Sequence, residues 1–375
     1  MKYIKLFEPF YSDRIKEITN EVMSNGQIAS GQYISKFENG LSELLNLRNV
    51  ISTADMTSSI SLALHLSGVD AGDEVISSPY ACMATNSPIS TLGAIPIWVD
   101  VMPNSVFMDP EKLEKAITSK TKAVIVYHVA GYVGYINEIS QICKKHNIKL
   151  IEDCNNSLLA TVNDNYAGSF GDFSVYSLYP NRQINAFEGG VLVCKNDSDA
   201  FKAKKLRRFG IDYHTFRSQN GEINPHSDIP VAGWSIGLNN LCASAAFVQL
   251  GSLNQRITNV RANAEYLARK LSNIDMLTLI SPLDNSKPVY WTFLILVKER
   301  NRVLELLKEK GIMASIMHYR NDKYSCFENN DDFELPNVAS IQERIIALPC
   351  GYWLDKSDLD KIVEELNSIL ELINK

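Results

Sequence analysis

Long apolar runs, targeting signals and basic blocks are absent from this sequence of 375 residues. No apolar segment approaches the roughly 20 residues that a membrane-spanning helix needs. The polar start, residues 1–10, is unlike a secretory signal peptide. The net charge is -6 and the sequence has no Lys/Arg cluster. It therefore predicts no basic surface that would bind nucleic acid or an acidic membrane. We therefore expect a cytoplasmic protein that binds neither membranes nor nucleic acid.

Paired cysteines and clustered histidines are lacking too. The seven cysteines are scattered without CxxC spacing, and the six histidines form no HExxH pattern. Scattered cysteines of this kind are usually reduced and buried, so the sequence predicts no metal site. What remains is an ordinary composition, with 45% hydrophobic and 21% charged residues. Such a composition is typical of a globular enzyme, and the length suffices for two domains.

The middle of the chain alternates short β-branched runs with helical segments. Strands are predicted at residues 74–78, 95–99, 123–127, 149–152, 173–177 and 190–194. Runs this short and apolar are typical of strands that are buried on both faces. Between the third and fourth strands, residues 136–146 carry apolar side chains at helical spacing and predict an amphipathic crossover helix. Alternation of this kind favours an α/β domain with a mainly parallel sheet.

After about residue 250 the pattern changes. The sequence predicts helices at 256–271 and 301–310, a strand at 290–297, and a last helix with Ser357 as its N-cap. We therefore predict a large cofactor-binding α/β domain, residues 1–250, and a small C-terminal α+β domain, residues 251–375.

Two polar places along the predicted sheet are candidates for ligand binding. Asp153 follows a buried strand, at the carboxyl edge where open α/β sheets bind ligands. Its carboxylate could pair with a protonated pyridine nitrogen or cap a following helix. Thr57 and Ser58 precede a predicted helix, 60–66, whose N-terminus could bind an anion or be capped in the ordinary way. Ser177, at the end of another strand, could add a hydroxyl to such an anion site.

A third place is the loop at residues 176–190, which reads YSLYPNRQINAFEGG. It resembles the cofactor-anchoring loop of DegT/DnrJ-type nucleotide-sugar aminotransferases, a branch of the fold-type I pyridoxal phosphate enzymes. In that family an aromatic-Ser segment leads to a lysine, and Glu-Gly-Gly follows. Similar segments occur in family order over nearly the whole chain, among them GDEVI at 72–76, GAIPIWVD at 93–100, GDFS at 171–174 and HYRND at 318–322.

The resemblance implies a role for each matching residue. Asp153 would pair with the pyridine nitrogen, and Arg182 stands at the position of the Schiff-base lysine. The other implied residues are Thr57, Ser58 and Ser177 for the phosphate, Cys82 and Asn156 around the cofactor ring, and His318 and Arg320 near the sugar or the amino donor. The resemblance also implies a homodimer, pyridoxal or pyridoxamine phosphate as cofactor, and glutamate or a similar amino donor.

Several positions depart from the family pattern. A lysine amine can be deprotonated and become nucleophilic, whereas the guanidinium of Arg182 stays protonated in a protein. Met56 replaces the glycine of the phosphate turn, and residues 155–157 replace the usual AHA or AQA. Residues 233–240 lack the polar groups with which the family segment reaches the cofactor of the partner subunit.

Three functions therefore remain open. The first is an aminotransferase that acts on a nucleotide-linked keto-sugar in surface-glycan or natural-product sugar biosynthesis. The second is a sugar 3-dehydratase that uses non-covalent pyridoxamine phosphate. The third is a catalytically silent homologue, with the cofactor absent, that binds a nucleotide-sugar or supports a partner subunit.

Overall fold

A computed structural model describes residues 3–327 and 333–373. Its main feature is a seven-stranded sheet in the order β1-β9-β8-β5-β4-β2-β3. The strands are β1 (Val50–Thr53), β2 (Glu74–Ser77), β3 (Ile95–Trp98), β4 (Thr121–Tyr127), β5 (Lys149–Asp153), β8 (Phe173–Ser177) and β9 (Gly190–Cys194). Strands β3, β2, β4, β5 and β8 pair in parallel, whereas β9 is antiparallel to both neighbours. The predicted α/β domain with a mainly parallel sheet is confirmed.

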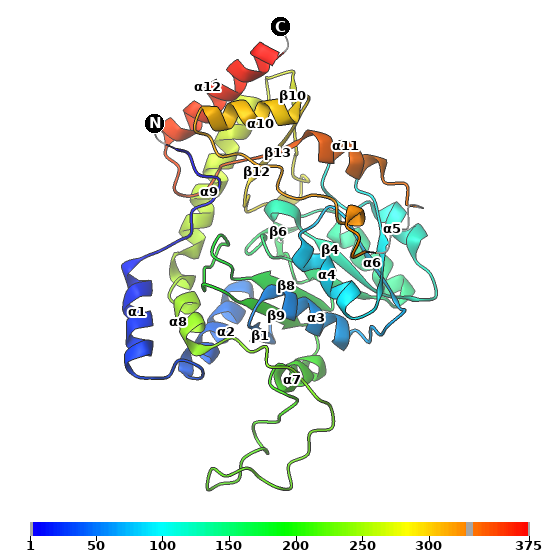
Figure 1. The fold of residues 1–375 in the computed structure, drawn as a ribbon, viewed down its shortest axis with the longest axis vertical. Helices are drawn as coiled ribbons and strands as arrows, with labels where there is room; N and C mark the ends of the chain where they lie inside the picture. Colours follow the sequence, from blue (N-terminus) through cyan, green and yellow to red (C-terminus); the bar gives the residue numbers. More distant parts are fainter. Residues whose placement is uncertain (1–2, 328–332, 374–375) are drawn as a thin grey trace.

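Helices cover both faces of this sheet (Figure 1). One face packs against α2 (Gln32–Leu45), α6 (Ile136–His146) and α8 (Asn240–Phe247), and the other against α3 (Met56–Leu66) and α7 (Asp197–Leu206). The crossover helix α6 has the predicted bounds, since its apolar stripe is buried against the sheet. The two buried faces explain why most strand positions are apolar. Polar strand residues such as Ser52 and Glu152 are buried with hydrogen-bond partners.

The C-terminal part is built on a three-stranded antiparallel sheet of β10 (Leu277–Leu279), β12 (Phe293–Val297) and β13 (Ile345–Leu348). Helices α10 (Arg300–Glu309) and α12 (Lys356–Ile373) pack with it. The long helix α9 (Leu250–Leu271) joins both cores, because its first half packs under the large sheet and its second half under the small one. The domain boundary at residue 250 stays a prediction.

The start of α12 differs from the prediction. Ser357 lies inside the helix, and Asp355 precedes it. Asp355 Oδ1 accepts hydrogen bonds from Asp358 N at 2.9 Å and from Ser357 Oγ at 2.7 Å. Ser357 as the N-cap was therefore wrong, because the carboxylate of Asp355, two residues earlier, supplies the acceptor that the helix N-terminus needs.

The first residues of the chain belong to the C-terminal part. Ile4 exchanges backbone hydrogen bonds with Gly311 and Met313, at 2.8 and 2.9 Å. From there residues 5–12, which we call the N-terminal strap, run along α9 toward α1 (Asp13–Ser24) (Figure 1). In the strap, the Phe7 ring stacks on Trp291 with the ring centroids 4.2 Å apart. The part built on the large sheet and the C-terminal part are thus connected by these contacts as well as by α9.

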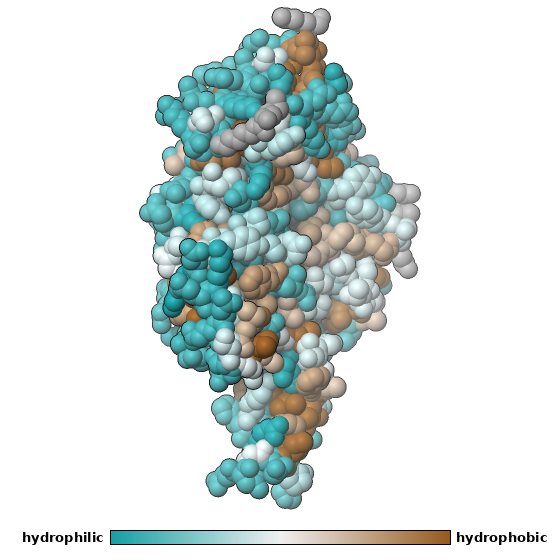
Figure 2. Space-filling view, turned by 60° about the vertical axis from the view of Figure 1, so that its left-hand side comes forward, coloured by the Kyte–Doolittle hydropathy of each residue, from teal (hydrophilic) through white to brown (hydrophobic). Residues whose placement is uncertain are grey.

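A long segment after α7, residues 207–239, projects from the bottom of the molecule (Figure 1). Figure 2 shows apolar atoms on this lower part. The large exposed apolar side chains of the segment are Phe209, Tyr213, Ile223, Ile229, Val231 and Trp234. None of the helices in the described ranges combines the length and the hydropathy that crossing a bilayer requires.

Candidate functional site

The candidate site begins where β4, β5 and β8 end together. The parallel register places Asp153 opposite Tyr127 on one side and Val175 on the other. The buried Asp153 carboxylate accepts hydrogen bonds from Thr85 Oγ1 at 2.7 Å and from N and Nδ2 of Asn155 at 3.0 and 2.9 Å. Burial raises the pKa of Asp153, and these hydrogen bonds oppose the rise. The Asp153 carboxylate therefore lies at the carboxyl edge of the sheet, where the sequence placed it, and its pairing with a pyridine nitrogen stays a prediction.

A chain of polar contacts runs beside Asp153. Asn156 Nδ2 donates to the Tyr127 hydroxyl at 2.8 Å, and that hydroxyl lies 3.1 Å from His318 Nε2. Burial and the positive charge of Arg182 lower the pKa of His318 to about 3, so the imidazole is neutral at physiological pH. The Tyr127 hydroxyl can therefore donate a hydrogen bond to Nε2 of the neutral His318. The Oδ1 atom of Asn156 is buried without a hydrogen-bond partner.

The structure thus brings the predicted residues Asn156 and His318 together with Asp153. Tyr127, which links them, was not selected from the sequence. Its signal was available, because it is the last residue of the strand predicted at 123–127, and neighbouring parallel strands end at the same edge.

Arg182 reaches this region from the loop between β8 and β9. Its Nη1 donates to Asn181 Oδ1 at 2.5 Å, and its guanidinium carbon lies 4.6 Å from the centre of the Trp291 ring. Burial lowers the pKa of Arg182, while Tyr127, Cys82 and Asp153 act in the opposite direction. The sequence contains no lysine between Lys149 and Lys195. This loop therefore supplies a cation and no amine.

The predicted anion site lies where the ends of β1, β8 and β9 meet α3. Ser177 pairs with Gly190, and Gly190 pairs with Thr53. Helix α3 begins at Met56, earlier than predicted, so Thr57 and Ser58 lie in its first turn. The close packing requires a glycine at 190, since a Cβ there would lie 2.3 Å from the carbonyl oxygen of Asp55.

A carboxylate already occupies the N-terminus of α3. Asp55 Oδ1 accepts a hydrogen bond from Ser58 N at 2.7 Å, and Oδ2 accepts one from Ser58 Oγ at 2.8 Å. Burial raises the pKa of Glu188, and the negative charge of the nearby Asp55 adds to this rise. Both donors that Ser58 could offer to an external anion are therefore engaged, and the surroundings are acidic.

Asp55 was missed because a run of Thr and Ser after it gave several equally good caps. The phosphate role of Thr57, Ser58 and Ser177 stays a prediction, and Asp55 is the residue that counts against it. The Ser177 hydroxyl itself accepts a bond from Tyr179 N at 3.3 Å.

Cys82 and Arg320, two other predicted residues, lie at the edge of the candidate site. Cys82 immediately precedes α4 (Met83–Thr91), is partly exposed, and is near enough to Arg182 to influence its pKa. Arg320 forms a bidentate pair with Asp322, with N–O distances of 2.7 and 2.6 Å. Its guanidinium is therefore engaged locally, and its substrate role stays a prediction.

Residues 233–240 lie beside the α3 N-terminus of their own chain. Ile236 O accepts a hydrogen bond from Ala54 N at 2.7 Å, and Gly237 bridges Thr53. The next turn begins α8, which Asn239 caps through Cys242 N at 2.8 Å. This segment therefore helps to fix the turn that carries Asp55.

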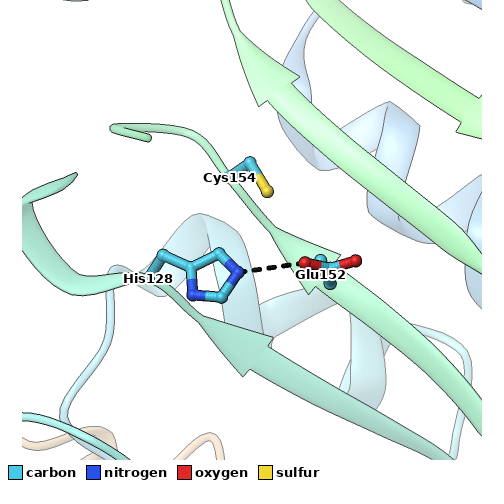
Figure 3. Close-up of side chains that lie close together, drawn as sticks. All are labelled: His128, Glu152 and Cys154. Carbon is cyan, nitrogen blue, oxygen red and sulfur yellow. Dashed lines mark hydrogen bonds and ion pairs between the residues drawn. The ribbon is translucent and has the colours of Figure 1, made fainter. Parts of the chain in front are cut away.

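One group of possible metal ligands occurs in the part of the chain that the structure describes: His128, Glu152 and Cys154 (Figure 3). Glu152 accepts hydrogen bonds from the backbone N–H groups of residues 168, 170 and 171 and lies 3.2 Å from His128 Nε2. Because both carboxylate oxygens are already engaged, Glu152 holds the turn before β8, and we assign the group a structural role. The absence of a metal site stays a prediction.

Known proteins match this chain over nearly its whole length. The sequence model of the DegT/DnrJ/EryC1/StrS aminotransferase family matches residues 11–367. The sugar aminotransferase CalS13 from Micromonospora echinospora superposes with a TM-score of 0.92 at 25% identity, covering 97% of this chain and 99% of that one. AtS13 from Actinomadura melliaura gives 0.92 at 27% identity, covering 98% and 99%.

A more distant structure carries the cofactor. Spr1654 from Streptococcus pneumoniae has been solved in a pyridoxamine phosphate form and a pyridoxal phosphate form, with TM-scores of 0.91 and 0.90. Both are 21% identical to this chain and cover 99% of it, with 100% of their own length matched. At this identity the likeness shows the fold alone.

Proposed function

The chain belongs to the DegT/DnrJ/EryC1/StrS aminotransferase family, and from this premise we propose that it binds a nucleotide-linked sugar without catalysing pyridoxal phosphate-dependent transamination. The observation that carries the proposal is Arg182, at the position that the resemblance assigns to the Schiff-base lysine. Covalent amine catalysis needs a neutral amine, and a guanidinium remains charged. A protonated Arg182 neither forms a Schiff base nor accepts a proton.

The fit of the cofactor fails at a second place. Pyridoxal phosphate, when bound, supplies an electron sink for carbanion chemistry. Its phosphate would need the N-terminus of α3, where Asp55 engages both donors of Ser58 and Glu188 lies nearby. Two carboxyl groups would repel a phosphate dianion. Asp153 retains the type of group that the ring nitrogen of such a cofactor needs, and Thr57 and Ser177 retain hydroxyls. The acidic surroundings of the α3 N-terminus nevertheless do not suit a phosphate, so the residues do not fit the cofactor.

Features around Asp153 support the binding half of the proposal. Asn156, Tyr127 and His318 form a polar chain at the carboxyl edge of the sheet, where α/β folds bind ligands. The unpartnered Oδ1 of Asn156 is an acceptor for a hydroxyl group. A sugar ring presents such hydroxyls, and relatives act on sugars, as the name of CalS13 records.

A homodimer is part of this proposal. The projecting segment 207–239 presents several large apolar side chains, including Phe209 and Trp234, each more than a third exposed. Apolar exposure of this kind favours association with another protein surface. A second copy of the chain is the partner that the family resemblance suggests, and ultracentrifugation tests it.

The decisive experiment titrates the purified protein with pyridoxal phosphate and then pyridoxamine phosphate, followed by borohydride reduction and mass spectrometry. We expect no covalent label and no saturable binding of either form. A panel of nucleoside diphosphate sugars, titrated by calorimetry, should contain at least one ligand. Tyr127→Phe should weaken its binding, and the exposed control Tyr11→Phe should not.

Other outcomes would favour the alternatives. Covalent labelling of a lysine together with amine transfer from glutamate to a keto-sugar would establish an aminotransferase. Binding of pyridoxamine phosphate with loss of a sugar hydroxyl would establish a 3-dehydratase. Either result contradicts the proposal.

A further inference from the structure

A separate pocket lies behind the Arg182 loop, between the N-terminal strap, α9 and the loop that follows β13. Its empty volume is about 460 Å³. The side chains that matter for its chemistry are Phe7, Arg182, Arg256, Trp291, Tyr352 and Trp353. That volume includes space that is open to solvent. Sites for small molecules commonly combine aromatic walls with a few fixed polar groups, and both are present here.

Arg256 is the central cation of this pocket. It projects from α9 and is 7% exposed. Its Nη1 donates to Gln183 O at 2.7 Å, and its guanidinium carbon lies 4.1 Å from the centre of the Phe10 ring. Its Nε and Nη2 are buried and have no hydrogen-bond partner. Burial lowers the pKa of Arg256 to about 10, so the group is still charged at neutral pH.

Arg182 adds a second guanidinium with an unmet donor. Its Nε is buried without a partner, although Nη1 is bonded to Asn181. Among the ion pairs within residues 3–327 and 333–373, neither Arg182 nor Arg256 has a carboxylate partner. Glu8, at the pocket rim, pairs instead with Lys5 at 3.2 Å. Within the described residues, the pocket therefore holds two guanidinium groups that have no carboxylate in ion-pair contact.

We propose that this pocket binds a small organic anion, a carboxylate or phosphate monoester attached to a flat apolar ring. The planar guanidinium fork matches carboxylate and phosphate oxygens, and a buried unmet N–H gains most from such a partner. The Tyr352 ring can contact the apolar part of the ligand, whereas the Trp291 ring is already engaged by Phe7 and Arg182. The proposal does not depend on whether Arg182 prevents cofactor chemistry.

The strap controls access to these donors. Phe10 stacks on the Arg256 guanidinium and shields it, so an anion reaches Nε and Nη2 only when the strap shifts. Binding should therefore change the hydrogen exchange of residues 5–12. Residues of α7, on the opposite face of the large sheet from the first half of α9, serve as the internal reference.

The test titrates the full-length protein with phenyl phosphate, benzoate and inorganic phosphate by calorimetry. We expect phenyl phosphate or benzoate to bind, and to bind at least about tenfold more tightly than inorganic phosphate, since only they fill the aromatic part of the pocket. Arg256→Gln should weaken binding by at least about tenfold, the value of one lost charged hydrogen bond. Arg256→Lys should restore part of it.

The matched control is Arg269→Gln, an exposed arginine later on the same helix, which should leave affinity unchanged within about twofold. A thermal melt of each variant checks folding. Absence of binding by both aryl anions, or equal binding by Arg256→Gln in a folded protein, overturns the proposal. Equal affinity for inorganic phosphate overturns the assignment of an aromatic ligand. Displacement of phenyl phosphate by uridine diphosphate at similar concentration would make the natural anion a nucleotide.

Discussion

The two ends of the candidate site, around Asp153 and around Asp55, use a carboxylate in opposite ways. Asp153 is held by neutral donors at the sheet edge, and its neighbour Asn156 keeps an unpartnered acceptor for a ligand. Asp55 engages both donors of Ser58 at the helix N-terminus and leaves neither for an external anion. The same chemical group thus prepares one end for binding and closes the other. A fold can therefore leave one end of a candidate site open to a ligand while the other end is satisfied from within.

The largest effect is expected when the phosphate-binding groups at the Asp55 end of the site are restored. We expect the triple variant Asp55→Ser, Met56→Gly, Arg182→Lys to bind pyridoxal phosphate about 100-fold more tightly than the wild type, or about 2.7 kcal/mol. Arg182→Lys alone should gain less than about tenfold, since Asp55 still repels the phosphate. Absorbance titrations measure both. If the single variant binds as tightly as the triple one, Asp55 does not prevent phosphate binding at the N-terminus of α3.

The second test concerns pH at the open end. The pKa of His318 is lowered to about 3 in the folded protein, below its ordinary value of about 6.5. The unfolded chain therefore binds the additional proton between these values, and stability falls as the pH drops through this window. The contribution of this one group is about 1.4 kcal/mol per pH unit.

Thermal unfolding between pH 7 and pH 5 measures this loss. His318→Gln should flatten the decline, whereas the exposed control His214→Gln should follow the wild type. Parallel curves for all three proteins would mean that His318 titrates normally.

The third test separates capping from ligand repulsion at Asp55. Asp55→Ala should lower stability by about 1 kcal/mol, as expected for the loss of a helix N-cap. Asp109, which caps α5 (Pro110–Ala116) through Glu111 N and Lys112 N, is the matched control. Both alanine variants should melt earlier by similar amounts, but only Asp55→Ala should gain affinity for inorganic phosphate. A gain in both would point to a non-specific effect.

The smallest effect is expected at Arg320. Because its guanidinium is paired with Asp322, Arg320→Ala should cost about 0.5 to 1 kcal/mol of stability. Affinity for a nucleoside diphosphate sugar should stay within about twofold of the wild type. A tenfold loss of affinity would instead place Arg320 in contact with the ligand.

Much of the fold could be predicted because its strands carry a strong local signal. The bounds of β8 and β9 match the predicted runs, since both faces of these strands are buried and every residue is selected for that environment. Helix ends were less certain. The start of α3 was placed too late because Asp55, Thr57 and Ser58 are all good caps, and only the folded turn decides between them.

The site residues, too, could be predicted only where a local sequence pattern marks them. Asp153 was found because the end of a buried strand is visible in the sequence. Arg256 was missed, since an arginine on an amphipathic helix ordinarily faces solvent. Its burial depends on Phe10 and Tyr352, which come from opposite ends of the chain. No local pattern contains that information.

The N-terminal strap imposes an order on folding. Phe7 of the strap stacks on Trp291, and Ile4, just before the strap, bonds to Gly311 and Met313, partners that are synthesised much later. Contacts between such distant parts of a chain form late, because a very long loop must first be closed. The large sheet can therefore assemble while the strap is still undocked. The wall of the arginine pocket is completed only when the last third of the protein has been made, so a nascent chain halted before that point would have its sheet but no pocket.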